Sequence, residues 1–173
     1  MNTNPVCILG AGPGGAAATL KLSQLNIPCI LVDKAVFPRD KVCGDAISGK
    51  AATILRRIDP TIIQHFEAQA HLQTDVWGIR FVAPNNRVID VPFKLNYDKA
   101  SDPKQGYVSK RLDFDHLLIE AVKKRSNITF HEGISIEQIE KIPGGFRLYD
   151  KSKNFQLETS LLIVANGANS QFS

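Results

Sequence analysis

The sequence predicts an α/β fold built on a parallel sheet, and three observations predict it. A short apolar segment, Val6–Leu9, leads directly into three closely spaced glycines and then into an alanine-rich stretch of helical character. A second apolar segment, 29–34, follows and is hydrophobic almost throughout, as strands buried on both faces are. A third such segment, 161–165, lies near the end of the sequence. A strand, a helix and a second buried strand in this order indicate parallel pairing.

The glycines follow the pattern Gly10-x-Gly12-x-x-Gly15 between a predicted strand and a predicted helix. In that context the first glycine permits a tight turn, the second lets a diphosphate approach the main chain, and the third lets the helix pack closely on the strand. The amino end of the helix adds free N–H groups and a partial positive charge. The predicted dinucleotide site comprises Gly10, Ala11, Gly12, Pro13, Gly14 and Gly15.

An acidic residue stands near the end of the second predicted strand. Asp33 lies 18 residues after Gly15, where a carboxylate would accept hydrogen bonds from the adenosine ribose and repel a 2′-phosphate. This position favours FAD or NAD over NADP, and the neighbouring Lys34 is included in the predicted site. The alternative that sequence alone leaves open is a glycine-rich turn that binds nothing.

Composition narrows the class of protein. The chain has 173 residues, and 43% are hydrophobic, which is enough for a core. The net charge is +4 and the basic residues are spread out, so we expect no nucleic-acid surface. The three cysteines and four histidines lack metal-ligand spacing, so we expect no metal. No apolar run could span a bilayer and the start is no signal peptide, so we expect a cytoplasmic location that leaves room for peripheral membrane contact.

A loop and two helices follow Asp33. The loop carries Arg39 and Lys41, either to neutralise a diphosphate or as solvated cations. Ser48 predicts the N-cap of a helix whose apolar residues recur at helical spacing, and a short helical piece covers 60–66.

From residue 71 the pattern changes to alternation. Segments 76–82 and 87–91 flank Pro84-Asn85-Asn86 and predict a β-hairpin, whereas a simple NAD dehydrogenase would continue with another strand–helix repeat. The aromatic residues of this region line an apolar substrate pocket or, the interpretation that we favour, belong to a core. They are Trp77, Phe81 and Phe93.

After the hairpin region the sequence again predicts strands and a helix in alternation, and then a three-stranded meander. Polar residues 96–105 predict a loop or hinge, and Asp113 is expected to cap an amphipathic helix. The further strands are expected at 107–110 and 127–132, in a three-stranded meander over 135–142, 146–150 and 155–158, and at 161–165. Cys7 and Cys29 lie in predicted strands and are expected to be small core residues.

The loop sequence FPRDKVCGDAIS resembles the PRxKxCG loop of the geranylgeranyl reductase family, a group of FAD-dependent oxidoreductases with the para-hydroxybenzoate hydroxylase fold. Arg111, Phe114, Asp115 and Leu118 resemble the R-x-x-F-D-x-x-L segment of that family. The resemblance implies a Rossmann-like FAD-binding domain with a three-stranded β-meander insertion and the start of a mostly antiparallel substrate-binding sheet.

The resemblance also implies roles for the loop residues. Arg39 would contact the FAD phosphates or ribityl chain, and Cys43, Gly44 and Asp45 would lie near the isoalloxazine ring. A cysteine beside a flavin can be redox-active or tune the position of a substrate, but we favour a packing role for Cys43.

Four further positions complete the implied site. Arg111 would reach the FAD, and Ile134 lies where such folds place main chain against the adenine. Asn166 and Gly167 stand where the family has an Asp-Gly pair, so the amide cannot bring the negative charge of the family's carboxylate. Asp115 is expected to be structural.

The resemblance covers essentially the whole chain, as the front part of a longer enzyme whose C-terminal remainder is absent. It implies FAD-binding segments at 1–68 and 105–173, and a partial substrate-domain hairpin with its return loop at 69–104.

The implied reaction is the reduction of C=C bonds in an apolar, prenyl or lipid-like small molecule, with NAD(P)H or ferredoxin as electron donor. No side chain stands out as catalytic. Two alternatives remain open: a flavin monooxygenase or halogenase on the same scaffold, and a non-catalytic NAD-binding or redox-sensing module.

Overall fold

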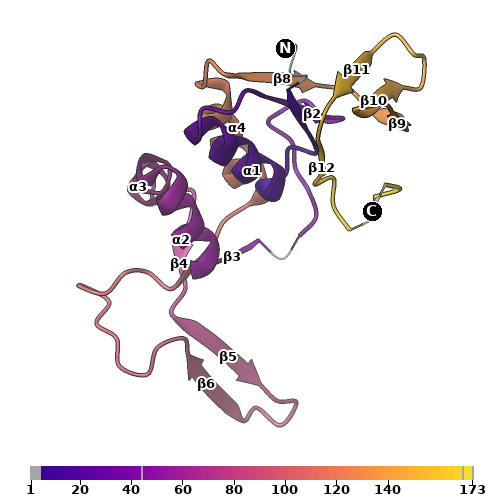
Figure 1. Cartoon of the computed structure of the whole chain (residues 1–173). Helices are drawn as coiled ribbons and strands as arrows, with labels where there is room; N and C mark the ends of the chain where they lie inside the picture. Colours follow the sequence, from indigo (N-terminus) through magenta and orange to yellow (C-terminus); the bar gives the residue numbers. More distant parts are fainter. Residues whose placement is uncertain (1–4, 44, 169, 173) are drawn as a thin grey trace. The chain divides into compact units, whose positions relative to one another are not determined.

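A computed structural model describes residues 5–43, 45–168 and 170–172 (Figure 1). The chain divides into two compact units, one formed by Met1–Arg39 with Asp115–Ser173 and the other by Asp40–Phe114. These boundaries differ from those of the predicted functional segments 1–68, 69–104 and 105–173. That functional division stays a prediction.

The helices of the described residues are α1 Pro13–Gln24, α2 Gly49–Ile58, α3 Pro60–Ala68 and α4 Arg111–Lys123. The strands are β1 Val6–Leu9, β2 Cys29–Asp33, β3 Ala46–Ser48, β4 Thr74–Asp75, β5 Gly78–Val82, β6 Val88–Pro92, β7 Gly106–Val108, β8 Ile128–Glu132, β9 Ile136–Ile142, β10 Gly145–Asp150, β11 Gln156–Thr159 and β12 Leu162–Val164.

The first unit is built on a parallel sheet with the strand order β12-β1-β2-β8. Each neighbouring pair in it is parallel, and Figure 1 shows β12, from the end of the chain, beside β1 from its start. In chain order this is the 3-2-1-4 arrangement of doubly wound nucleotide-binding folds. The predicted α/β class with a parallel sheet is therefore confirmed.

Helix α1 packs on β1 and β2 through small and apolar side chains. Ala16 and Leu20 are buried on its inner face, and Cys29 of β2 donates its thiol to the carbonyl of Thr19 at 3.9 Å. Alanine at the contact lets the helix axis approach the sheet closely, which the alanine-rich sequence predicts.

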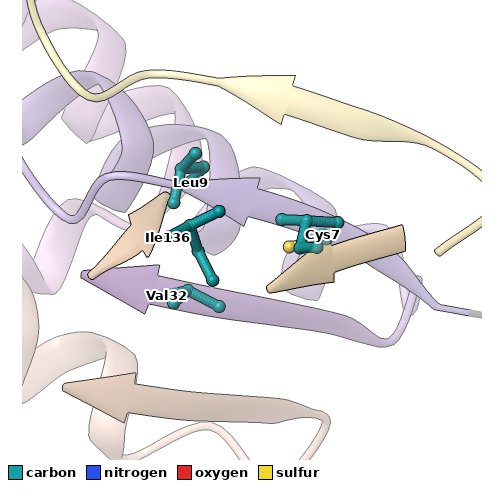
Figure 2. Close-up of a cluster of buried hydrophobic side chains, with 5 residues drawn as sticks. Cys7, Leu9, Val32 and Ile136 are labelled. Atoms are coloured by element: carbon teal, nitrogen blue, oxygen red, sulfur yellow. The ribbon is translucent and has the colours of Figure 1, made fainter. Parts of the chain in front are cut away.

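The meander β9-β10-β11 is antiparallel, as predicted, and it closes the core of this unit. Cys7 and Leu9 of β1 and Val32 of β2 meet Ile136 and Leu148 from the meander (Figure 2). Burial raises the pKa of the Cys7 thiol to about 12, so it stays protonated at neutral pH. The prediction that Cys7 is a core residue is confirmed.

The second unit has its own small core under helices α2 and α3. The antiparallel strands β3, β7 and β4 form its sheet, and Phe66 of α3 packs edge-on against Tyr107 and Phe114 with ring centroids 5.3 and 5.4 Å away. Ser48 caps α2, since its hydroxyl accepts a hydrogen bond from the Ala51 N–H at 3.3 Å, as predicted.

Three polar side chains join the elements of this second core. The hydroxyl of the buried Tyr107 donates to the carboxylate of Glu67, and the Arg56 guanidinium lies 2.6 Å from the same carboxylate oxygen. Burial and the neighbouring carboxylate raise the pKa of Tyr107. The network ties β7 to both helices.

The predicted hairpin forms as β5 and β6, but its aromatic residues are not core residues. Phe81 is 56% exposed and Phe93 is 48% exposed, so that interpretation is wrong for both. Trp77 stacks on Tyr97 with a centroid distance of 5.1 Å. The physical reason is that the described part of the chain places no second layer on the hairpin.

Two other predictions are also corrected. Helix α4 begins at Arg111, so Asp113 lies in its first turn rather than at its N-cap. An acid there still interacts favourably with the helix dipole. Cys43 is exposed, so the packing role that we favoured for it is wrong.

No helix among the described residues has the length and hydrophobicity needed to cross a membrane. Over the same residues, no group of three or more His, Cys, Asp and Glu side chains is arranged to hold a metal ion.

Candidate nucleotide site

The turn between β1 and α1 is fixed by its approach to the strand at the other end of the chain. Gly10 has a φ of +105°, which L side chains rarely adopt. A Cβ on it would also lie 2.6 Å from the carbonyl oxygen of Ala165 and 2.6 Å from the Cα of Asn166. The turn and the segment after β12 are therefore in direct main-chain contact.

The first turn of α1 folds back onto this same turn. A Cβ on Gly15 would lie 1.7 Å from the carbonyl oxygen of Gly10, whereas a Cβ on the exposed Gly14 would have nothing within 4 Å. Gly12 stands at the N-cap with extended geometry and Pro13 occupies the first helical position, with no acidic residue in the first turn. The helix therefore begins at a glycine turn and carries no acidic side chain in its own first turn.

Asp33 holds this turn in place from the end of β2. One carboxylate oxygen accepts a hydrogen bond from the Ala11 N–H at 2.6 Å, and the other accepts from the Ala35 N–H at 2.8 Å. A carboxylate oxygen can accept a second hydrogen bond, so acceptor sites remain for hydroxyl groups of a ligand. Sequence reasoning identified Asp33 but missed its bond to the glycine turn.

These groups lie at the point where the order of the strands in the sheet reverses. From β1 the chain continues to β2 on one side, and on the other side β1 pairs with β12, which comes last in sequence. In doubly wound sheets, ligands bind outside the carboxyl ends of the strands at this switch point. The Gly10–Gly15 turn follows the carboxyl end of β1, Asp33 is the last residue of β2, and the Asn166 segment follows β12.

A second carboxylate supports the segment that follows β2. Glu132, paired with Asp33 across the sheet, accepts a hydrogen bond from the Phe37 N–H at 3.0 Å and lies 3.2 Å from the Lys123 ammonium. These contacts, the Phe37 bond foremost, lower the pKa of Glu132. Its place at the carboxyl end of a predicted parallel strand was the sequence signal that could have identified it.

Arg39 is held by an ion pair rather than solvated. Its Nη1 lies 2.7 Å from Oδ2 of Asp115, whose side chain is fully buried, and its guanidinium carbon lies 5.0 Å from the centre of the Phe37 ring. The alternative that Arg39 is a solvated cation is therefore wrong. A contact of Arg39 with a diphosphate stays a prediction. The ion pair had no signal in the sequence, because its two members are 76 positions apart.

The other predicted residues of this unit lie around the same strand ends. Lys34 is exposed, Ile134 is half-buried and donates its N–H to the carbonyl of Asp33 at 2.9 Å, and Asn166 is exposed. Gly167 is also exposed and has a φ of +97°. The structure thus brings Asp33, Ile134 and the glycine turn together around the ends of β1 and β2.

Cys43, Asp45 and Arg111 belong to the second unit. Asp45 adopts a φ of +51°, and its carbonyl accepts a hydrogen bond from the Ser109 N–H at 2.9 Å. Gly44 lies outside the described residues. The predicted contacts of these four residues with a flavin stay predictions.

No protein-family model matches the chain. It is 42% identical to the menaquinone reductase of Mycolicibacterium smegmatis over 59 residues, which are 34% of this chain and 14% of that protein. It is 28% identical to conditioned medium factor receptor 1 of Dictyostelium discoideum over 94% of this chain and 33% of that protein. It is 25% identical to the digeranylgeranylglycerophospholipid reductase of Methanosarcina acetivorans over 96% of this chain and 38% of that protein.

Solved structures share the fold at low sequence identity. A flavin-dependent halogenase superposes with a TM-score of 0.79 at 22% identity, over 100% of this chain and 31% of that one. The p-nitrophenol 4-monooxygenase of Pseudomonas putida gives a TM-score of 0.78 at 14% identity, over 98% of this chain and 42% of that one. The predicted similarity to geranylgeranyl reductases and to flavoproteins of this fold is confirmed, and the chain spans less than half the length of each of these proteins.

Proposed function

We propose that this chain is the FAD-binding part of a flavin-dependent oxidoreductase that reduces C=C bonds of a prenyl or other lipid-like substrate. One observation carries the proposal: the Gly10–Gly15 turn and the Asp33 carboxylate meet at the switch point of a 3-2-1-4 parallel sheet. The similarity to a digeranylgeranylglycerophospholipid reductase supports this reaction.

Each part of the site has a physical role in this proposal. The N–H groups at the start of α1 receive the diphosphate, with a dipole that no acidic side chain of the first turn offsets. Asp33 orients the turn through the Ala11 N–H and receives ribose hydroxyls at its remaining acceptor sites. FAD, when bound, supplies hydride transfer, while the protein supplies binding and orientation.

In the same proposal, NAD(P)H or ferredoxin donates the electrons, and the protein works in the cytoplasm with peripheral membrane contact. A monooxygenase or halogenase is the second candidate, because the halogenase fold covers the whole chain. Product analysis under ¹⁸O₂ distinguishes the reductase from the monooxygenase or halogenase. A product that carries ¹⁸O, or a halogenated product, would contradict the reductase proposal.

The nucleotide itself is tested by titrating FAD into the 173-residue chain and following the flavin fluorescence, with NAD and NADP in parallel. We expect FAD to bind and ADP to compete with it, since the turn and Asp33 both face the ADP half. A chain that binds NAD and not FAD would instead support the NAD-binding module.

A further inference from the structure

The main chain passes between the two compact units twice, and one ion pair joins the two crossings. The main chain leaves the first unit after Arg39 and returns to it at Asp115. These two residues form the 2.7 Å contact between Nη1 and Oδ2. The last residue before the excursion 40–114 and the first residue after it are therefore bound to each other.

The two members of the pair are held differently. Asp115 lies within α4, next to Leu118, Ile119 and Val122, which are buried as well, so its position is set by the helix. Arg39 lies in a segment without regular structure. Asp115 is thus held within a regular helix, whereas the position of Arg39 depends on its side-chain contacts.

Those contacts converge on Arg39 from both sides. Phe37 is 6% exposed, packs on Phe130 at a centroid distance of 6.1 Å and supports the guanidinium on its ring face. The Asp115 carboxylate, fully buried, needs a cation for its charge, because an unpaired buried carboxylate is strongly disfavoured. Arg39 satisfies that need with 18% of its side chain exposed.

We propose that Arg39 and Asp115 form a clamp that fixes the start of the loop after Arg39 to helix α4, so that Asp115 is a positioning residue for that loop. In this assignment the main role of Arg39 is that of counter-ion to Asp115. The clamp requires no bound nucleotide, so its test is independent of the proposed FAD site.

The test is hydrogen exchange of residues 40–43 and tryptic cleavage after the exposed Lys41, both in the nucleotide-free chain. Opening of a segment governs both rates when reclosing is fast. Arg39→Gln and Asp115→Asn should each raise exchange and cleavage by about tenfold or more, because each removes the ion pair between Nη1 and Oδ2. The double variant should resemble the single ones, since the pair is lost only once.

The control is the pair Arg80–Asp90, which has the same shortest N–O distance of 2.7 Å but makes two hydrogen bonds between side chains that are 67% and 58% exposed. Arg80→Gln should change neither readout by more than about twofold, because exposed pairs contribute little. Should Arg39→Gln fail to fold, Arg39→Lys keeps the charge and loses the planar face over Phe37, and it should retain most of the protection.

The charge swap Arg39→Asp with Asp115→Arg supplies the decisive readout. Partial recovery of protection over 40–43 supports the clamp, because a role in binding phosphate cannot be rescued by moving the cation to α4. Single variants that match the Arg80→Gln control, or single effects that simply multiply in the double variant, would overturn it.

Discussion

Replacing Gly15 by alanine should disrupt the candidate site from within the helix, and Gly14 provides the matched control one residue away. A Cβ at position 15 would lie 1.7 Å from the carbonyl oxygen of Gly10, far inside the 3.0 Å that real Cβ contacts keep. The obstacle is main chain, and the Gly10 carbonyl cannot rotate away as a side chain can. Either the glycine turn or the start of α1 has to move.

The magnitudes follow from this geometry. Overpacking of a well-packed contact costs about 1–3 kcal/mol and sometimes more. Gly14→Ala meets nothing within 4 Å and gains helix propensity of about 0.5–1 kcal/mol. The two variants should therefore differ by about 2 kcal/mol or more in the free energy of unfolding, with opposite signs relative to the parent chain.

Urea unfolding followed by circular dichroism measures this difference, and FAD titration of both variants follows the site. We expect Gly14→Ala to bind FAD nearly as the parent does and Gly15→Ala to bind it at least about tenfold more weakly, because the N–H groups of the turn are displaced. Equal unfolding free energies for the two variants would refute the packing argument. Unchanged FAD binding by Gly15→Ala would refute the diphosphate's placement at the helix start.

Four further outcomes are expected. Gly12→Val should abolish FAD retention by blocking the approach of the diphosphate to the main chain, and a purified variant that stays yellow would contradict this. Asp33→Asn should cost about 1–3 kcal/mol of stability, since an amide nitrogen then faces a main-chain N–H; nucleotide-free urea titration checks it. The pKa of Glu132 lies below its ordinary value of 4.5, so its charge adds stability above pH 4.5, and this stability is lost as the pH falls through the pKa of the folded state. Glu132→Gln should therefore flatten the acid side of the pH–stability curve, and an unchanged curve would exclude the Phe37 bond as its cause. Tyr107→Phe should cost about 1–2 kcal/mol, and a thermal melt within 1 °C of the parent would show that the Tyr107 hydrogen bond contributes nothing net.

The sequence predicted the parallel strands, the meander, the hairpin and the glycine turn because each depends on local pattern. Buried parallel strands require continuous hydrophobicity, and the spacing of Gly10, Gly12 and Gly15 carries its own geometric meaning. The Ser48 cap was equally local, since its hydroxyl bonds three residues ahead.

The wrong predictions share a dependence on what lies across space. Phe81 and Cys43 are apolar enough for a core, but burial is decided by which other elements cover a residue, and the pattern of one strand or loop does not contain that. Helix α4 begins at Arg111, whereas an N-cap at Asp113 predicts that it begins at residue 114.

By itself the amino-acid sequence determined the helices, the glycine turn and most strands, but not the short strands β3 and β4, because the predicted features arise from neighbours within a few residues. Only the tertiary structure decided that the Asp33 carboxylate holds the Ala11 N–H, and that Arg39 is bound to a buried Asp115. A buried charge must be paired, but which of many distant charges becomes its partner depends on how strands and helices are brought together, and this is settled when the sheet forms.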